Sequence, residues 1–230
     1  MQLPLSFKLN ASISFDNFIY PQEPFLLASI KQFVLGESGP VMFLWGAQST
    51  GKTHLLQAVC QYAATEDFSV SYLPMEELIA YAPEALDGME SFSVICIDDL
   101  HLIADRPDWQ QAMFNLFNRV ADNGGRLLFT ANVSPKELLL ELKDLGSRLE
   151  WGPVFHLQEL EDAEKIKVLI ARGRQVGLTL GPEVASYLLS RFPRNLSALI
   201  EVLDKLDETS LVAQRKITIP FIREVFGDQL

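Results

Sequence analysis

One eight-residue segment constrains this chain more than any other. It reads Gly46-Ala47-Gln48-Ser49-Thr50-Gly51-Lys52-Thr53 and satisfies the pattern G-x-x-x-x-G-K-[ST]. It follows an apolar run at 41–45, which is typical of a strand covered on both faces, and it precedes a helical pattern at 54–64. A strand, a glycine-rich turn and a helix in this order predict a loop that holds the phosphates of a nucleoside di- or triphosphate.

The residue types of this loop fit phosphate chemistry. Glycines let the backbone turn tightly enough for successive N–H groups to point at phosphate oxygens, and the helix amino terminus adds a partial positive charge. Lys52 is expected to reach the β- and γ-phosphates, and the Thr53 hydroxyl is expected to ligate Mg²⁺. A chance glycine-rich turn is the alternative, and the strand and helix in register argue against it.

A second motif supplies carboxylates. The apolar run 94–97 is followed directly by Asp98 and Asp99, so a buried strand delivers two acids at its carboxyl end, where parallel sheets bind ligands. Asp98 is predicted to hold the magnesium ion, and Asp99 is placed to orient or deprotonate an attacking water. An acidic helix cap after a core strand is the alternative, and the upstream phosphate loop makes it the weaker one.

Strands alternate with helices up to about residue 160, and only helical patterns follow. The pattern predicts an α/β fold, with a five-stranded parallel sheet flanked by helices and a small all-helical lid at the carboxyl end. The expected segments are a tail at 1–10, the α/β domain at 11–160 and the lid at 161–230. Strands are predicted at 41–45, 70–73, 92–97, 126–130 and 155–157, and helices at 26–35, 54–64, 75–81, 109–123, 138–142, 162–176, 182–192, 195–208 and 219–226.

Composition excludes several classes of protein. A formal charge of −11 and a pI near 4.7 argue against a general grip on nucleic acid, so no sequence-specific DNA binding is expected. Two cysteines, Cys60 and Cys96, lie far apart in apolar runs and suggest reduced thiols. No apolar run approaches the length of a membrane span, and a cytoplasmic protein is expected.

Five short motifs, in matching order, carry a family resemblance. From Phe15 to its carboxyl end the chain resembles the AAA+ ATPases, and among them the bacterial replication initiator DnaA. The resemblance does not extend to the helix-turn-helix domain of an initiator or to its long amino-terminal domain. It therefore points to the DnaA homologues that regulate DnaA. The motifs are Phe15-Asp16-Asn17-Phe18, Asp98-Asp99-Leu100-His101, Thr130-Ala131-Asn132, Gly146-Ser147-Arg148-Leu149-Glu150-Trp151-Gly152 and Arg194-Asn195-Leu196.

The resemblance assigns roles to three polar residues. Arg148 matches the arginine finger that enters a neighbouring subunit's site, with an ordinary surface arginine paired to Glu150 as the alternative. Arg194 matches the sensor 2 residue that contacts bound nucleotide, with a surface charge at a helix start as the alternative. Asn132 matches the polar sensor 1 position, and Thr130 is the other candidate.

Two further groups of residues are implied. Phe18, Ile19 and Tyr20 are expected to face the nucleobase, and His54, directly after the phosphate loop, to contact the nucleotide. The tail Gln2-Leu3-Pro4-Leu5-Ser6-Phe7 is similar to short peptides that bind the DNA polymerase III sliding clamp, with Gln2, Leu3, Leu5 and Phe7 filling a groove. A first edge strand is the alternative, which Pro4 disfavours.

Together these features favour a regulatory protein. The resemblance implies that the chain binds ADP or ATP with Mg²⁺, ADP being the expected resting nucleotide. With the DNA-loaded sliding clamp it would stimulate ATP hydrolysis by DnaA through Arg148, and so prevent re-initiation of replication. Weak or no turnover of its own is expected, and a homodimer or higher oligomer is open. The alternative is an autonomous ATPase or helicase loader that uses Asp99 as base.

Overall fold

The computed structural model describes residues 13–20, 23–213 and 215–227, and these form two compact units. The first unit is an α/β unit that holds most of the described chain up to Gln158. The second, a helical unit, holds the described residues from Glu159 onward together with short segments at 19–20 and 48–50. The proposed clamp-binding residues Gln2, Leu3, Leu5 and Phe7 lie outside the described residues. In the described part, no helix is both long and apolar enough to cross a bilayer.

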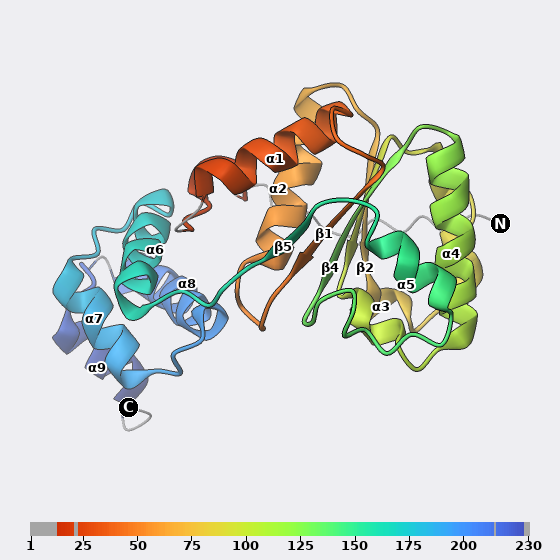
Figure 1. Ribbon diagram of the computed structural model, residues 1–230. Coiled ribbons are helices and arrows are strands. Elements are labelled where there is room, and N and C mark those ends of the chain that lie inside the picture. The colour runs from red at the N-terminus through yellow and green to blue at the C-terminus, as the bar shows by residue number, and fades with distance from the viewer. Residues whose placement is uncertain (1–12, 21–22, 214, 228–230) are drawn as a thin grey trace. The chain divides into compact units, whose positions relative to one another are not determined.

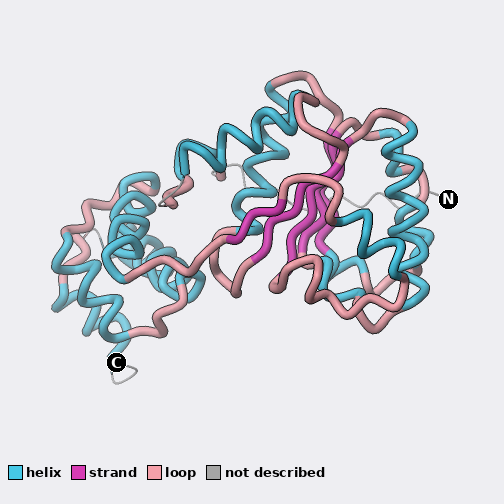
Figure 2. The backbone as a smooth tube through the Cα atoms, viewed as in Figure 1, coloured by secondary structure: helices cyan, strands magenta, loops and turns pink. Residues whose placement is uncertain are grey.

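The α/β unit is built on one five-stranded sheet, whose strands are magenta in Figure 2. All of its paired strands are parallel. The strand order is β2-β3-β4-β1-β5, so β1 sits between β4 and the edge strand β5. β1 is apolar along its whole length, and β3 up to its last residue, because helices cover both faces of the sheet. The predicted five-stranded parallel sheet is confirmed. The strands are β1 (Val41–Trp45), β2 (Val70–Pro74), β3 (Val94–Asp98), β4 (Arg126–Ala131) and β5 (Val154–His156).

Helices cover the two faces of this sheet (Figure 1). α1 (Glu23–Leu35) and α2 (Lys52–Thr65) lie together on one face, and α4 (Pro107–Asp122) and α5 (Lys143–Leu149) on the other. α4 has its apolar side chains at helical spacing, so one stripe of the helix is buried against the sheet. Shorter helical turns complete the unit: α3 (Met75–Leu78) and the 3₁₀ turns η1 (Phe15–Asn17), η2 (Pro83–Leu86), η3 (Met89–Ser91) and η4 (Leu100–Ile103).

One predicted helix is wrong. Residues 138–142 form bends and irregular loop rather than a helix, and the helix of this region is α5, at Lys143–Leu149. The end of this loop is held by Gln110, a fully buried side chain of α4, whose Oε1 accepts a hydrogen bond from the Leu142 N–H. The leucine spacing at 138–142 favours a helix in the sequence. Gly146 and Ser147 are weak helix formers, so the sequence does not predict the helix that forms at 143–149.

The helical unit consists of four helices among the described residues: α6 (Asp162–Gln175), α7 (Pro182–Arg191), α8 (Leu196–Ala213) and α9 (Ile219–Phe226). Caps define their starts. Glu161 and Glu164 form a reciprocal capping pair at α6, Asn195 Oδ1 accepts the Ala198 N–H at α8, and the Thr218 hydroxyl caps α9. The four helices enclose their own apolar core, which includes Leu169, Leu188, Leu199, Leu203, Phe221 and Ile222. The predicted helical lid is confirmed.

Candidate nucleotide-binding site

The loop Gly46–Thr53 joins the end of β1 to the start of α2, as its pattern predicts. Ser49 and Gly51 have left-handed backbones with φ of 64° and 95°, which turn the chain sharply before the helix. The Gly46 N–H bonds to the Ala131 carbonyl of β4. A side chain could not replace the hydrogen of Gly51, because a Cβ there would lie 2.9 Å from the Phe18 ring. The residue at 51 must therefore be glycine for two independent reasons.

Lys52 is the buried cation of this loop. Its side chain is nearly covered, and Nζ donates hydrogen bonds of 2.8 Å to both the Gly46 and the Ala47 carbonyl oxygens. Burial lowers its pKa, an effect that the carboxylates of Asp99 and Asp98 oppose. The ammonium group therefore lies where the loop and the amino terminus of α2 meet, which suits a phosphate oxygen.

Asp98, at the carboxyl end of β3, is held from both neighbouring strands. The Tyr72 hydroxyl of β2 donates 2.8 Å to Oδ2, and the Thr130 hydroxyl of β4 donates to Oδ1. The Asp99 N–H in turn donates 3.0 Å to Thr130 Oγ1. Both oxygens of this buried carboxylate are thus fixed in direction. Asp98 and the exposed Thr53 hydroxyl offer the hard oxygen donors that Mg²⁺ prefers, so the residues present fit the ion.

Sequence reasoning missed Tyr72. Its signal is only positional: Tyr72 pairs in register with Cys96 on β3, two residues before Asp98. Burial and the Asp98 carboxylate raise the pKa of the Tyr72 phenol, so the hydroxyl keeps the proton that it donates. Thr130 was only the second candidate at the sensor position, yet it bridges Asp98 and Asp99. Asn132 is exposed in the turn after β4.

Asp99 combines strain with an unfavourable charge. Its backbone is left-handed, with φ 57° and ψ 46°. Burial, reinforced by the neighbouring Asp98 charge, raises the pKa of its carboxyl, whereas His101 and Lys52 lower it. His101 Nδ1 lies 3.9 Å from Asp99 Oδ1, and burial lowers the pKa of that imidazole. Such a position is typical of functional carboxylates, whose placement costs stability.

Asp99→Asn should therefore stabilise the free chain, by on the order of 0.5–2 kcal/mol at neutral pH. Asparagine tolerates the left-handed backbone and removes the charge. Because the folded chain raises the pKa of Asp99 above the unfolded value of about 3.9, the wild-type chain loses stability as pH rises through the folded pKa. The variant's advantage should thus be larger at pH 7.5 than at pH 4.5, as urea unfolding would show.

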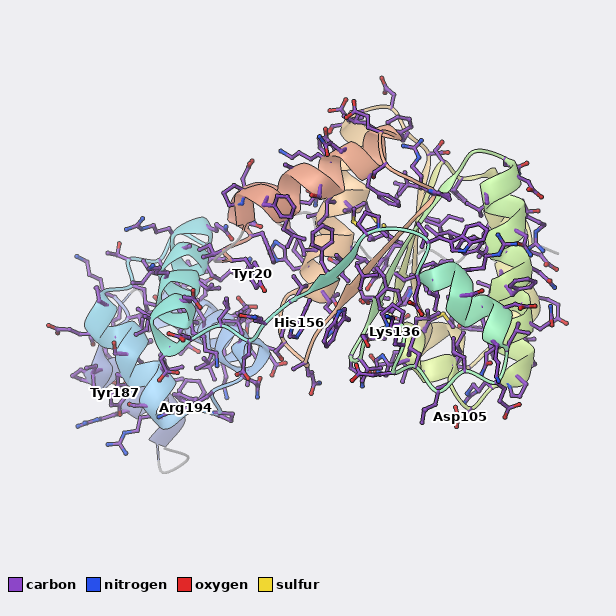
Figure 3. The ribbon with its side chains drawn as sticks, in the orientation of Figure 1. Tyr20, Asp105, Lys136, His156, Tyr187 and Arg194 are labelled. Atoms are coloured by element: carbon purple, nitrogen blue, oxygen red, sulfur yellow. The ribbon has the colours of Figure 1, made fainter. Side chains whose placement is uncertain are left out.

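The exposed Asp105 (Figure 3) provides the control for this substitution. Asp105→Asn should leave the free energy of unfolding unchanged within about 0.5 kcal/mol at both pH values. Failure of Asp99→Asn to raise the free energy of unfolding, or an equal rise at the two pH values, would contradict the conclusion that the Asp99 charge destabilises the fold.

The segment predicted to face the base packs close to the phosphate loop. Phe18 is buried, with its ring against Gly51 and 5.5 Å from the His54 ring. His54 Nε2 lies 3.1 Å from the Ser14 carbonyl oxygen. His54 thus links this segment to α2. The sequence predicts a nucleotide contact for His54 and does not predict this link. Ile19 and Tyr20 are half-buried.

The two arginines have different surroundings. Arg194 lies in the helical unit just before α8 (Figure 3), with NH1 3.4 Å from Asp162 Oδ2, and both side chains are mostly exposed. Arg148 on α5 forms no ion pair with Glu150 among the described residues, and the Glu150 carboxylate instead lies 3.8 Å from Lys136 Nζ. Its guanidinium carbon instead lies over the Trp151 ring, 3.9 Å from the centroid.

Comparison with protein families gives two matches that divide the chain as the structure does. Residues 9–156 match the model of the bacterial DnaA ATPase domain. The chain belongs to the bacterial DnaA ATPase family. Residues 162–226 of this DnaA-family chain match a second model, the lid domain of Hda, which covers the four helices α6 to α9. The resemblance to DnaA inferred from the five short motifs is confirmed.

Solved structures agree on the fold. Domain III of DnaA from Thermotoga maritima matches with a TM-score of 0.81 at 21% identity, over 96% of this chain and 98% of that one. AMPPCP-bound DnaA from Aquifex aeolicus matches with a TM-score of 0.70 at 24% identity, over 86% of this chain and 66% of that one. The Holliday junction motor RuvB of Thermotoga maritima also matches, with a TM-score of 0.67 at 14% identity over 93% and 71%. The DnaA-family chain therefore has the AAA+ fold.

Proposed function

We propose that this protein regulates DnaA by supplying Arg148 to the ATP bound by a DnaA subunit, so that DnaA hydrolyses its ATP. The observation that carries the proposal is the state of Arg148. Among the residues that the structure describes, no carboxylate pairs with this half-buried guanidinium and no acceptor takes a hydrogen bond from it. A half-buried guanidinium whose N–H groups bond no acceptor in the described part of its own chain can form charge-assisted hydrogen bonds to an anion that a partner provides. A phosphoryl group in a neighbouring subunit would be such an anion.

The chain's own site is proposed to hold ADP or ATP. Lys52 and the backbone of Gly46–Thr53 would hold the phosphates, and Phe18 and Tyr20 would lie near the base. Thr53 and Asp98 would hold Mg²⁺, which neutralises phosphate charge when bound. The AMPPCP bound to DnaA of Aquifex aeolicus supports an adenine nucleotide. Arg194 is the proposed sensor residue of the helical unit.

Lys52→Ala should weaken binding of ADP by about 10- to 100-fold, the worth of a charge-assisted hydrogen bond to phosphate. Calorimetric titration of the purified chain with ADP and Mg²⁺ measures this. Lys136→Ala is the control, because Lys136 is a largely exposed lysine whose ion pair with Glu150 is long and weak. Equal affinity of wild type and Lys52→Ala would contradict the phosphate role of the loop.

The sliding clamp is the proposed second partner, through the tail Gln2 to Phe7. In this proposal DnaA and the clamp contact the DNA, and this chain does not. The charge of the chain fits that role, because its 30 acidic and 19 basic residues disfavour binding to phosphate backbones. Capture of the clamp by the full chain and by a chain lacking residues 1 to 8 tests the assignment. Equal recovery of the clamp by both would contradict it. Loss only with the shortened chain is expected.

A further inference from the structure

Three aromatic side chains surround the guanidinium of Arg148, and we call Phe114, Phe117 and Trp151 the aromatic seat. The Arg148 Cζ atom lies 3.9 Å from the Trp151 ring centroid, 5.7 Å from that of Phe117 and 6.0 Å from that of Phe114. The phenylalanines come from α4 and Trp151 follows α5, and these two helices pack against each other (Figure 1). Cation–π attraction therefore replaces the ion pair that Arg148 lacks.

The tryptophan of the seat is held from two directions although it is 57% exposed. The fully buried Phe117 ring meets it edge-on, with centroids 5.9 Å apart and planes at 86°. The next residue, Gly152, passes so close to β1 that a Cβ there would lie 1.7 Å from the Val41 carbonyl oxygen. Trp151 is thus restrained by the Phe117 ring and by the close packing of the next residue on β1, so it offers the guanidinium one ring face.

A guanidinium over an aromatic ring is restrained through its face, and its N–H groups stay available along its edge. Ordering a free arginine side chain costs conformational entropy worth up to about 30-fold in a rate, and a restrained one avoids part of that cost when it meets a phosphate. An ammonium group lacks the planar face. The seat therefore suits arginine, and not lysine, as the group that is offered to a partner.

We propose that Trp151, backed by Phe117, is a positioning residue for Arg148: it orders the guanidinium before a partner's phosphoryl group arrives. This inference rests on the proposed function. It predicts that Trp151→Leu lowers the maximal rate of stimulated ATP hydrolysis by DnaA about 3- to 30-fold, the ordering cost of the arginine side chain that the seat avoids. Trp151→Phe, which keeps a ring face, should retain most of the rate.

The kinetic test titrates each variant against DnaA carrying ATP, with clamp loaded on DNA. A positioning residue changes the maximal rate and leaves the concentration for half-maximal stimulation nearly constant. The opposite pattern, a raised half-maximal concentration with an unchanged maximal rate, would make Trp151 a docking contact and overturn the proposal. An equal loss with Trp151→Phe and Trp151→Leu would overturn it as well.

A double-mutant cycle on the free chain separates the seat from the proposed function. Arg148→Ala, Trp151→Leu and the double variant are unfolded in urea, and the seat predicts a coupling of about 2- to 5-fold in the unfolding equilibrium constant. Absence of coupling would overturn the seat whatever DnaA does. The other outcome is coupling in the free chain while the wild-type chain leaves ATP hydrolysis by DnaA unchanged. That outcome would contradict the proposed function, and with it the positioning role of Trp151.

Discussion

Arg148→Ala should abolish the proposed stimulation of ATP hydrolysis by DnaA while leaving the chain folded. An arginine supplied in trans is worth about 10³ to 10⁵ in the rate of phosphoryl transfer, because it neutralises charge that develops in the transition state. Its removal should return hydrolysis to the intrinsic rate of DnaA. The measurement is release of labelled phosphate from DnaA with clamp-loaded DNA, at equal concentrations of wild-type and variant chain.

Two further variants test whether that loss is specific to an arginine at position 148. Arg174→Ala removes an exposed arginine from α6 and should stimulate as well as the wild-type chain. Arg148→Lys keeps the charge but has neither the planar face nor the forked donors of arginine, so it should stay close to the Ala variant. Full stimulation by Arg148→Ala would show that this residue is no arginine finger.

Gly152→Ala should destabilise the chain by about 3 kcal/mol or more, enough to unfold a marginal domain. A Cβ at this position would lie 1.7 Å from the Val41 carbonyl oxygen and 2.7 Å from its carbon, and a backbone neighbour cannot move aside as a side chain can. Val41 begins β1, which leads directly into the phosphate loop. Urea unfolding of the purified variant, or its failure to accumulate in soluble form, measures the effect.

Gly146, six residues earlier, is the matched control. A Cβ there meets no atom within 4 Å, and the residue lies inside α5, where alanine is the better helix former. Gly146→Ala should therefore stabilise by about 0.5–1 kcal/mol. Opposite signs at the two glycines are expected. A Gly152→Ala chain as stable as the wild type would mean that the close approach of residues 152 and 41 is not formed in solution.

Local patterns in the sequence predict the secondary structure that carries the candidate site. The loop Gly46–Thr53, the strand ending in Asp98 and the lid helix α9 at Ile219–Phe226 were all predicted close to their observed positions. Each depends on residues adjacent in the chain, where spacing alone decides between strand, turn and helix. The order of strands and helices was enough to predict a parallel sheet.

Contacts between distant segments were not predictable in this way. The bond from Tyr72 to Asp98 joins two strands whose register the sequence does not show. The helix α5 was misplaced, because leucine spacing at 138–142 outweighed a glycine-containing segment that Gln110 of α4 helps to position. The seat of Arg148 was missed for the same reason: Phe117 is more than thirty residues away from the arginine that it supports.

The proposed function places the stimulated ATP hydrolysis on DnaA and not on this chain. The direct measurement is a single turnover with labelled ATP bound to DnaA beforehand, clamp loaded on DNA, and this chain carrying unlabelled ADP. Adding the chain should convert the labelled ATP to ADP that remains on DnaA, at a rate set by the chain's concentration. Label that stays ATP on DnaA, while the chain turns over free ATP by itself, would contradict it.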